Sequence, residues 1–299
     1  MKLAYAVWAK FPDWGEPVEL TLETLLRQIA KIGYEAVEIG AFRGMEAFYL
    51  YMSDEKIRQV NQLIDSLGLT LTCIDAGGGS PLYSSEYGYL VRDTMDRAAT
   101  INFMKKTIDL ASQMKTGNVV DLSGRKPPNM KDPQAWELLV SCVGEICDYA
   151  ASRKINYLIE TENGFLVHNA ETILKLIQAV DSSAMKVNFD YSNFLLDGSS
   201  EEQIKEAIRK LSKYIVNAHI KGVGKDPKTS NHIFVIPGGS EEVQDIHGYL
   251  NALKEIGYQG ALMIEDLPYA QTPPKSTIES AMLSYATMSK ILKDREKGA

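Results

Sequence analysis

The sequence predicts a single domain with the (β/α)8 barrel fold, in which eight parallel strands alternate with helices. Short β-branched segments alternate with longer amphipathic segments along the whole chain. Eight such units fit into 299 residues with no linker-like run between them. The main alternative is an open doubly wound sheet, which carries a glycine-rich phosphate turn after its first strand. Here the first strand is followed by Trp8-Ala9-Lys10-Phe11-Pro12, so we favour the barrel.

The predicted elements are defined by hydrophobic periodicity. The predicted strands are Leu3–Val7, Ala36–Ile39, Leu69–Asp75, Asn118–Leu122, Asn156–Glu160, Lys186–Asp190, Ile215–Ile220 and Ala261–Glu265. The predicted helices are Thr21–Ile32, Asp54–Leu67, Ala99–Met114, Pro133–Arg153, Asn169–Val180, Glu201–Leu211, Asp245–Ile256 and Ser276–Leu292. In the first helix, an apolar stripe indicates a face that packs on the sheet.

Turn residues support these boundaries. Gly33 and Gly257 each follow a predicted helix and precede a strand, where a glycine can adopt the left-handed conformation that ends a helix. Ser53 has the side chain of a helix N-cap. We therefore predict that the barrel domain spans residues 1–292 and that residues 293–299 form a charged, frayed C-terminal tail.

The composition excludes several classes of protein. Hydrophobic residues make up 45% and charged residues 24% of the chain, as in an average globular protein. The net charge of −7 argues against nucleic-acid binding, which normally needs a basic surface. No apolar run is long enough to predict a membrane span or a signal peptide. Three cysteines without a paired motif suit a reducing compartment, so we expect a cytoplasmic protein.

Ionisable residues lie at the ends of most of the predicted strands. In this fold the active site is built at the carboxyl ends of the strands. Seven of the eight predicted strands end in or near such a residue: Glu38, Asp75, Asp121, Glu160, Asp190, His219 and Glu265. Several carboxylates around one opening repel each other unless a cation neutralises them.

The last four strands offer Glu160, Asp190, His219 and Glu265. Three carboxylates and one imidazole suit a divalent ion such as Mn²⁺, Mg²⁺, Co²⁺ or Zn²⁺. Thiolate ligands are missing from this set, which argues against a structural zinc site. Any one of these residues could simply end a strand or face solvent, but their recurrence in successive units favours a metal site. Glu162 is the rival of Glu160 as a ligand.

Five motifs carry a resemblance to a known family. They are Ile32-Gly33-Tyr34-Glu35-Ala36-Val37-Glu38-Ile39, Leu158-Ile159-Glu160-Thr161, Val187-Asn188-Phe189-Asp190, Ala218-His219-Ile220-Lys221 and Ile256-Gly257-Tyr258-Gln259-Gly260-Ala261-Leu262-Met263-Ile264-Glu265. Their order and spacing resemble the xylose isomerase-like TIM barrel superfamily, specifically its sugar phosphate isomerase/epimerase branch. The resemblance implies one divalent metal ion, commonly Mn²⁺, on Glu160, Asp190, His219 and Glu265. It also implies that Glu160 and Glu265 form an acid/base pair.

The implied activity is a sugar or sugar-phosphate isomerase or epimerase. A carboxylate cannot easily remove a proton next to a ketose carbonyl unless a metal stabilises the resulting enediolate. One glutamate would remove the proton and the other would return it. Return to the same carbon from the opposite face is epimerisation, and return to the adjacent carbon is aldose–ketose isomerisation. The sequence does not choose between them.

Five further residues are candidate substrate contacts. Lys225 stands six residues after the candidate metal histidine, where ketose 3-epimerases of this superfamily carry an arginine. Asn163 and Asn193 each follow a candidate ligand by three residues and could bind sugar hydroxyls or support the ligands. Trp14 follows the first strand and could stack on a sugar, and Glu38 ends the second. The alternative interpretation is that these five residues are ordinary loop residues, pack in the core or face solvent.

A basic loop is a further candidate for substrate binding. Lys221, Lys225 and Lys228 could meet a substrate phosphate or carboxylate, or could be solvated.

Other functions are also compatible with the sequence. A lyase such as an inosose dehydratase would use the same site. Phosphodiester cleavage, as in endonuclease IV, is disfavoured because it uses many histidines and this chain has four. A non-catalytic sugar-binding barrel is the non-enzyme alternative. The sequence leaves the sugar, the native metal and homo-oligomer formation open.

Overall fold

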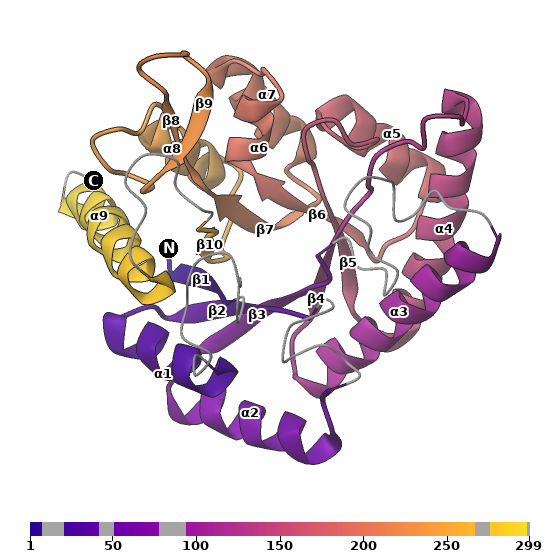
Figure 1. Ribbon diagram of the computed structural model, residues 1–299, viewed down its shortest axis with the longest axis horizontal. Helices are drawn as coiled ribbons and strands as arrows, with labels where there is room; N and C mark the ends of the chain where they lie inside the picture. The colour runs from indigo at the N-terminus through magenta and orange to yellow at the C-terminus, as the bar shows by residue number, and fades with distance from the viewer. Residues whose placement is uncertain (8–20, 42–50, 78–93, 267–275, 298–299) are drawn as a thin grey trace.

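Eight parallel strands close into a barrel that is surrounded by helices in a computed structural model of the protein (Figure 1). The structure describes residues 1–7, 21–41, 51–77, 94–266 and 276–297. Around the barrel the strands follow the order β1-β10-β7-β6-β5-β4-β3-β2, and the ring closes between β2 and β1. The predicted (β/α)8 barrel is therefore confirmed.

The barrel strands lie close to their predicted positions. They are β1 Leu3–Val7, β2 Ala36–Gly40, β3 Thr70–Asp75, β4 Asn118–Leu122, β5 Asn156–Glu160, β6 Met185–Asp190, β7 Ile215–Ile220 and β10 Leu262–Ile264. The helices are α1 Leu22–Ile32, α2 Asp54–Ser66, α3 Thr94–Gln113, α4 Asp132–Arg153, α5 Ala170–Val180, α6 Tyr191–Leu196, α7 Glu201–Leu211, α8 Ile246–Glu255 and α9 Thr277–Lys297. Among the described residues, no helix has the length and apolar character needed to cross a bilayer.

Three local features depart from the predicted pattern. The short helix α6 begins directly after β6, and the Asp190 side chain caps it by accepting a hydrogen bond from the Asn193 backbone N–H. After β7 the chain forms an antiparallel hairpin of β8 Gly222–Lys225 and β9 His232–Val235. In addition, α9 continues to Lys297, past the predicted helix end at Leu292. Six helical residues and four-residue strands are too short to give a clear periodic signal.

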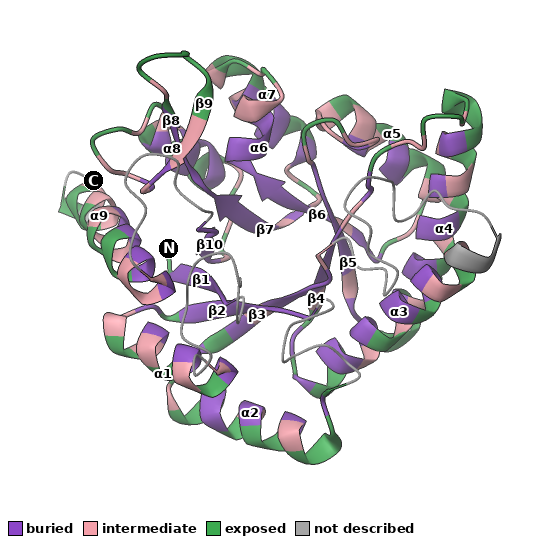
Figure 2. Ribbon diagram, viewed as in Figure 1, coloured by how far each residue is buried: buried purple, intermediate pink, exposed green. Residues whose placement is uncertain are grey.

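The apolar interior forms two layers, one inside the barrel and one between the strands and the helices. Four alanines and one methionine fill part of the barrel interior, where Ala4, Ala6, Ala36, Ala261 and Met263 pack together. The larger cluster joins the outward faces of the strands to the helices. Figure 2 shows this arrangement as barrel strands that are buried along most of their length and helices with a buried stripe. Side chains alternate between these two layers along each strand.

This alternation decides which strand-end residues face the barrel interior. Glu160 shares a face with Leu158, which packs inside the barrel. Asp121 shares a face with Val119, which belongs to the outer layer. The buried Asp121 carboxylate accepts a 2.7 Å hydrogen bond from the Tyr157 hydroxyl. Asp121 therefore faces the helices, and its expected place among the acidic residues at the barrel opening is wrong.

Candidate metal centre

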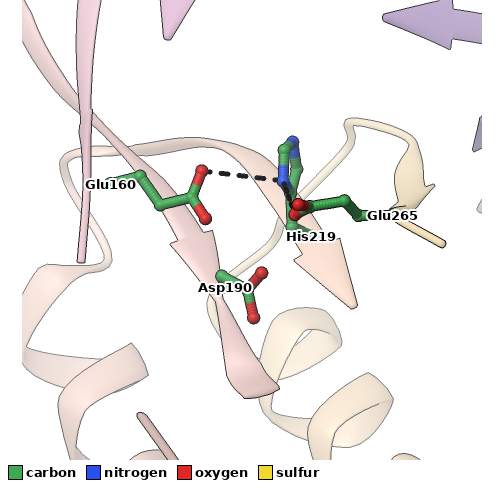
Figure 3. A group of neighbouring side chains, drawn as sticks. All are labelled: Glu160, Asp190, His219 and Glu265. Carbon is green, nitrogen blue, oxygen red and sulfur yellow. Dashed lines mark hydrogen bonds and ion pairs between the residues drawn. The ribbon is translucent and has the colours of Figure 1, made fainter. Parts of the chain in front are cut away.

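Four side chains from the second half of the barrel meet at its carboxyl end (Figure 3). Glu160 and Asp190 are the last residues of β5 and β6, His219 lies near the end of β7, and Glu265 directly follows β10. The strand register pairs Asp190 with His219 and His219 with Met263, which brings the strand ends to one level. One ligand atom from each of the four residues lies within 4.8 Å of the others.

The donor set fits a divalent cation. The four residues offer carboxylate oxygens and one imidazole nitrogen, and all four are buried. His219 Nδ1 lies 3.3 Å from Glu265 Oε2 and 3.7 Å from Glu160 Oε2. Buried carboxylates at this spacing are stable only when positive charge or hydrogen-bond donors neutralise them. Oxygen and imidazole donors of this kind are the ligands that Mn²⁺, Mg²⁺, Co²⁺ and Zn²⁺ accept.

Two asparagines hold the Glu160 carboxylate in place. Asn188 Nδ2 donates to Glu160 Oε2 at 2.6 Å, and Asn193 Nδ2 donates to Glu160 Oε1 at 2.9 Å. Asn193 also donates to the backbone carbonyl of Thr161 at 2.8 Å. It lies on α6, a short helix that the sequence did not predict. Asn193 therefore holds the carboxylate of Glu160, a candidate ligand.

A second carboxylate fixes the other side of His219. Glu38 Oε2 lies 3.0 Å from His219 Nε2 and accepts a 3.1 Å hydrogen bond from Asn217 Nδ2. Glu38 is fully buried, with an exposed fraction of 0%. A carboxylate on one ring nitrogen of a histidine commonly holds the other nitrogen ready for a metal. The structure thus places Glu38 against His219, whereas the sequence suggested that Glu38 contacts the substrate.

Lys221 also lies at this centre, although the sequence grouped it with an exposed basic loop. Its Nζ forms an ion pair with Asp190, lies 2.6 Å from Glu265 Oε2, and lies 3.6 Å from Glu160 Oε1. Its exposed fraction is only 4%, so the interpretation of Lys221 as part of a solvated loop is wrong. The available signal was its spacing, because a residue two positions after His219 points to the same side of an extended chain.

These contacts shift the pKa values of the two glutamates in opposite directions. Burial raises the pKa of Glu160 well above its ordinary value, and the nearby Lys221 and His219 offset only part of that effect. Burial would also raise the pKa of Glu265, but Lys221 and His219 lower it to about 2. Carboxyl groups whose pKa values are driven apart in one site are typical of acid/base pairs.

The remaining predicted substrate residues lie farther out or outside the described residues. Asn163 is exposed and donates a 3.3 Å hydrogen bond to the backbone carbonyl of Leu196. Lys225 is exposed at the end of β8, where it pairs with His232 in the hairpin. Trp14 lies outside the described residues. The structure therefore brings together the four candidate ligands, Asn193 and Glu38, but not Asn163 or Lys225.

Comparison with known proteins assigns the family. The sequence profile described as "Xylose isomerase-like TIM barrel" matches residues 26–286. The chain belongs to this family. The resemblance found in the five sequence motifs is thus confirmed at the level of the superfamily.

The relatives of the chain include enzymes of two kinds. Fructoselysine 3-epimerase from Shigella flexneri is 22% identical over 271 residues, which cover 88% of this chain and 91% of the relative. A 3-dehydroshikimate dehydratase from Bacillus anthracis is 24% identical over 200 residues, covering 64% of this chain and 62% of the relative. Among solved structures, the zinc-bound IOLI protein has a TM-score of 0.75 and 18% identity, and the match covers 98% of this chain and 99% of that protein.

Proposed function

We propose that the protein is a divalent-metal-dependent isomerase or epimerase that acts on a sugar or a sugar phosphate. The observation that carries this proposal is the convergence of Glu160, Asp190, His219 and Glu265, whose ligand atoms lie within 4.8 Å of one another. Similarity to fructoselysine 3-epimerase over 88% of the chain supports it.

The same four side chains would hold the metal ion. Mn²⁺ is the favoured ion, and the zinc-bound structure of the related IOLI barrel supports a divalent metal in this fold. A bound ion would supply positive charge that stabilises the negative charge developing on substrate oxygens when a carbon-bound proton leaves. Glu38 would orient His219 so that Nδ1 faces the ion, because Nε2 is occupied by the contact with Glu38.

Glu160 and Glu265 would transfer the proton. They belong to the ends of β5 and β10, which are separated in the barrel by β6 and β7, so they approach His219 from different strands (Figure 3). One carboxylate would accept the proton from the carbon next to the carbonyl, and the other would return a proton to the substrate. Asn188 and Asn193 would keep the Glu160 carboxylate at a fixed angle during this transfer.

The outer contacts of the substrate are proposed from the sequence. Lys225 and Asn163 are exposed side chains that could meet the polar groups of a sugar. Trp14 is proposed to cover an apolar face of the sugar. Lys225 offers a single charged group where the 3-epimerases of the superfamily use an arginine. A lysine ammonium would bind a substrate oxygen or a phosphate with less geometric selectivity than a planar guanidinium.

A dehydratase is the second candidate, and the similarity to a 3-dehydroshikimate dehydratase favours it. Both reactions begin when a carboxylate removes a proton next to a carbonyl. In a dehydratase the electron pair left on carbon forms a double bond and expels the neighbouring hydroxyl group, which leaves as water after protonation. The same carboxylate pair can supply the base and the acid for this step.

A single assay in D₂O separates these reactions. Chelator-treated protein is reloaded with Mn²⁺ and incubated with ketoses, aldoses and inososes, and NMR follows deuterium incorporation and product formation. We expect metal-dependent deuterium incorporation at one carbon of an active substrate, with a new sugar as product. An unsaturated product would instead identify the dehydratase.

Glutamine variants test the two carboxylates. Glu160→Gln and Glu265→Gln should each abolish the exchange while the circular dichroism spectrum stays unchanged. The matched control is Glu162→Gln, because Glu162 is close in the sequence to Glu160 but is not one of the four converging residues. Exchange that persists in both variants, or that needs no metal, would contradict the proposed function.

A further inference from the structure

The ammonium group of Lys221 lies against the carboxylates that the candidate metal centre would offer to an ion. Its Nζ forms an ion pair with Asp190 and lies 2.6 Å from Glu265 Oε2. Glu160 Oε1 is 3.6 Å away. Lys221 thus contacts each of the three carboxylates of the candidate metal centre, while His219 is the one member of that centre with no ion pair to it.

The backbone of Lys221 is fixed by two buried side chains. Ser192 Oγ accepts a 2.9 Å hydrogen bond from the Lys221 N–H and donates a 2.7 Å hydrogen bond to the Lys221 carbonyl. Gln244 Nε2 donates to the same carbonyl at 2.6 Å. Ser192 and Gln244 have exposed fractions of 0% and 7%. The start of the side chain is therefore held at the edge of the centre.

The next residue restricts the backbone further. A Cβ atom on Gly222 would lie 1.9 Å from the Val235 carbonyl oxygen, so only glycine allows β9 to pass this close to the chain. The hairpin and α6 together fix Lys221 from both sides, and both elements follow strands that carry candidate ligands. By contrast, the Lys221 side chain has rotatable bonds through which the ammonium group can move.

We propose that Lys221 is a resident cation that neutralises the three carboxylates in the metal-free protein and competes with the divalent ion for them. Metal binding would then displace the ammonium group from Glu160 and Glu265. This proposal rests on the proposed metal centre, but it does not depend on which reaction the protein catalyses. It explains why buried carboxylates can stay close together before any ion arrives, since an unpaired buried charge is strongly destabilising.

The test measures the affinity for Mn²⁺ in chelator-treated protein by isothermal titration calorimetry. Removing a positive charge only a few ångström from the site should strengthen cation binding, so Lys221→Met should bind Mn²⁺ at least about tenfold more tightly than the wild type. The matched control is Lys228→Met, which removes an exposed lysine from the loop between β8 and β9 and should leave the affinity unchanged.

Thermal unfolding gives a second readout. Metal-free Lys221→Met should unfold at a lower temperature than the metal-free wild type, and saturating Mn²⁺ should raise its melting temperature by a larger amount. If Lys221→Met does not fold without metal, Lys221→Gln provides the same comparison with a neutral hydrogen-bond donor.

The outcomes distinguish this proposal from the proposed function. Equal or weaker Mn²⁺ binding by the Lys221 variants would overturn it. Such a result is expected if Lys221 merely holds Asp190 in place and thereby favours metal binding. The expected order of affinities would uphold it even in a protein that shows no isomerase, epimerase or dehydratase activity. Absence of Mn²⁺ binding in the wild type and in all Lys221 variants would overturn both this proposal and the metal centre.

Discussion

Acidic residues at the ends of neighbouring strands serve different purposes on the two faces of the barrel wall. On the inner face, Glu160 at the end of β5 meets three other candidate ligands and a lysine. On the outer face, Asp121 on β4 meets the Tyr157 hydroxyl and the Leu122 N–H, between the barrel and the helices. The two residues lie on adjacent strands, and only the direction of the side chain separates a candidate metal ligand from a carboxyl group in the protein core.

The two environments also have different electrostatic consequences. Burial raises the pKa of Asp121 to about 7, and the hydrogen bonds from Tyr157 and Leu122 lower it only in part. On the inner face, Lys221 and His219 overcome the effect of burial on Glu265 and lower its pKa to about 2. Cationic partners therefore accompany the acidic residues where we propose a metal, whereas neutral donors accompany the acid in the outer layer.

The largest expected effect is on catalysis at the inner face. With the substrate found in the D₂O assay, Glu265→Gln should lower kcat by about 10²–10⁴-fold, because it removes one member of an acid/base pair. Asp121→Asn should retain kcat within a few fold in the same assay. A comparable loss in both variants would remove the distinction between the two faces.

The next effect is on stability at the outer face. Asp121 is protonated more readily in the folded protein than in the unfolded chain, so its contribution to the free energy of unfolding is full below pH 4 and is lost as the pH rises to about 7. Relative to Asp121→Asn, the wild type should lose up to about 4 kcal/mol between pH 4 and pH 8. Urea unfolding of both proteins across this range measures the difference. A difference in the free energy of unfolding between the two proteins that does not change with pH would contradict the raised pKa of Asp121.

A smaller effect on metal binding is expected at Glu38, which contacts His219 inside the barrel. Glu38→Gln should weaken Mn²⁺ binding by about 10–100-fold, as is typical when the partner of a ligating histidine is changed. Calorimetric titration of the metal-free variant measures this loss. Asn217→Ala, which removes a donor to Glu38 without removing the carboxylate, should cost less affinity. Unchanged Mn²⁺ binding in Glu38→Gln would return Glu38 to the role of substrate contact that the sequence suggested.

The sequence predicted the barrel well because its eight strands stand out as short apolar segments and the long helices between them carry an amphipathic period. All eight barrel strands were predicted to within a few residues, and the strand ends then gave the four candidate ligands. The sequence could not place Asp121 on the outer face, because strands of a parallel barrel are apolar on both sides and their pattern does not mark the inner one. The positions of Glu38 and Lys221 depend on side-chain depth within the barrel opening, which is a tertiary property.

Two short elements, α6 and the β8–β9 hairpin, position residues of the candidate metal centre. α6 carries Asn193, which binds Glu160, and the hairpin begins directly after Lys221. Neither element has enough residues to produce a helical or strand period, so sequence reasoning treated them as loops. It therefore interpreted Lys221, Lys225 and Lys228 as one basic group, although Lys221 is buried and the other two are exposed.

One divalent ion should bind at the carboxyl ends of β5, β6, β7 and β10. The most direct test is anomalous X-ray diffraction from crystals of the protein grown with Mn²⁺. We expect one strong anomalous peak within about 2.6 Å of a donor atom from each of Glu160, Asp190, His219 and Glu265. A peak at another place, or no peak among these four residues at saturating Mn²⁺, would contradict it.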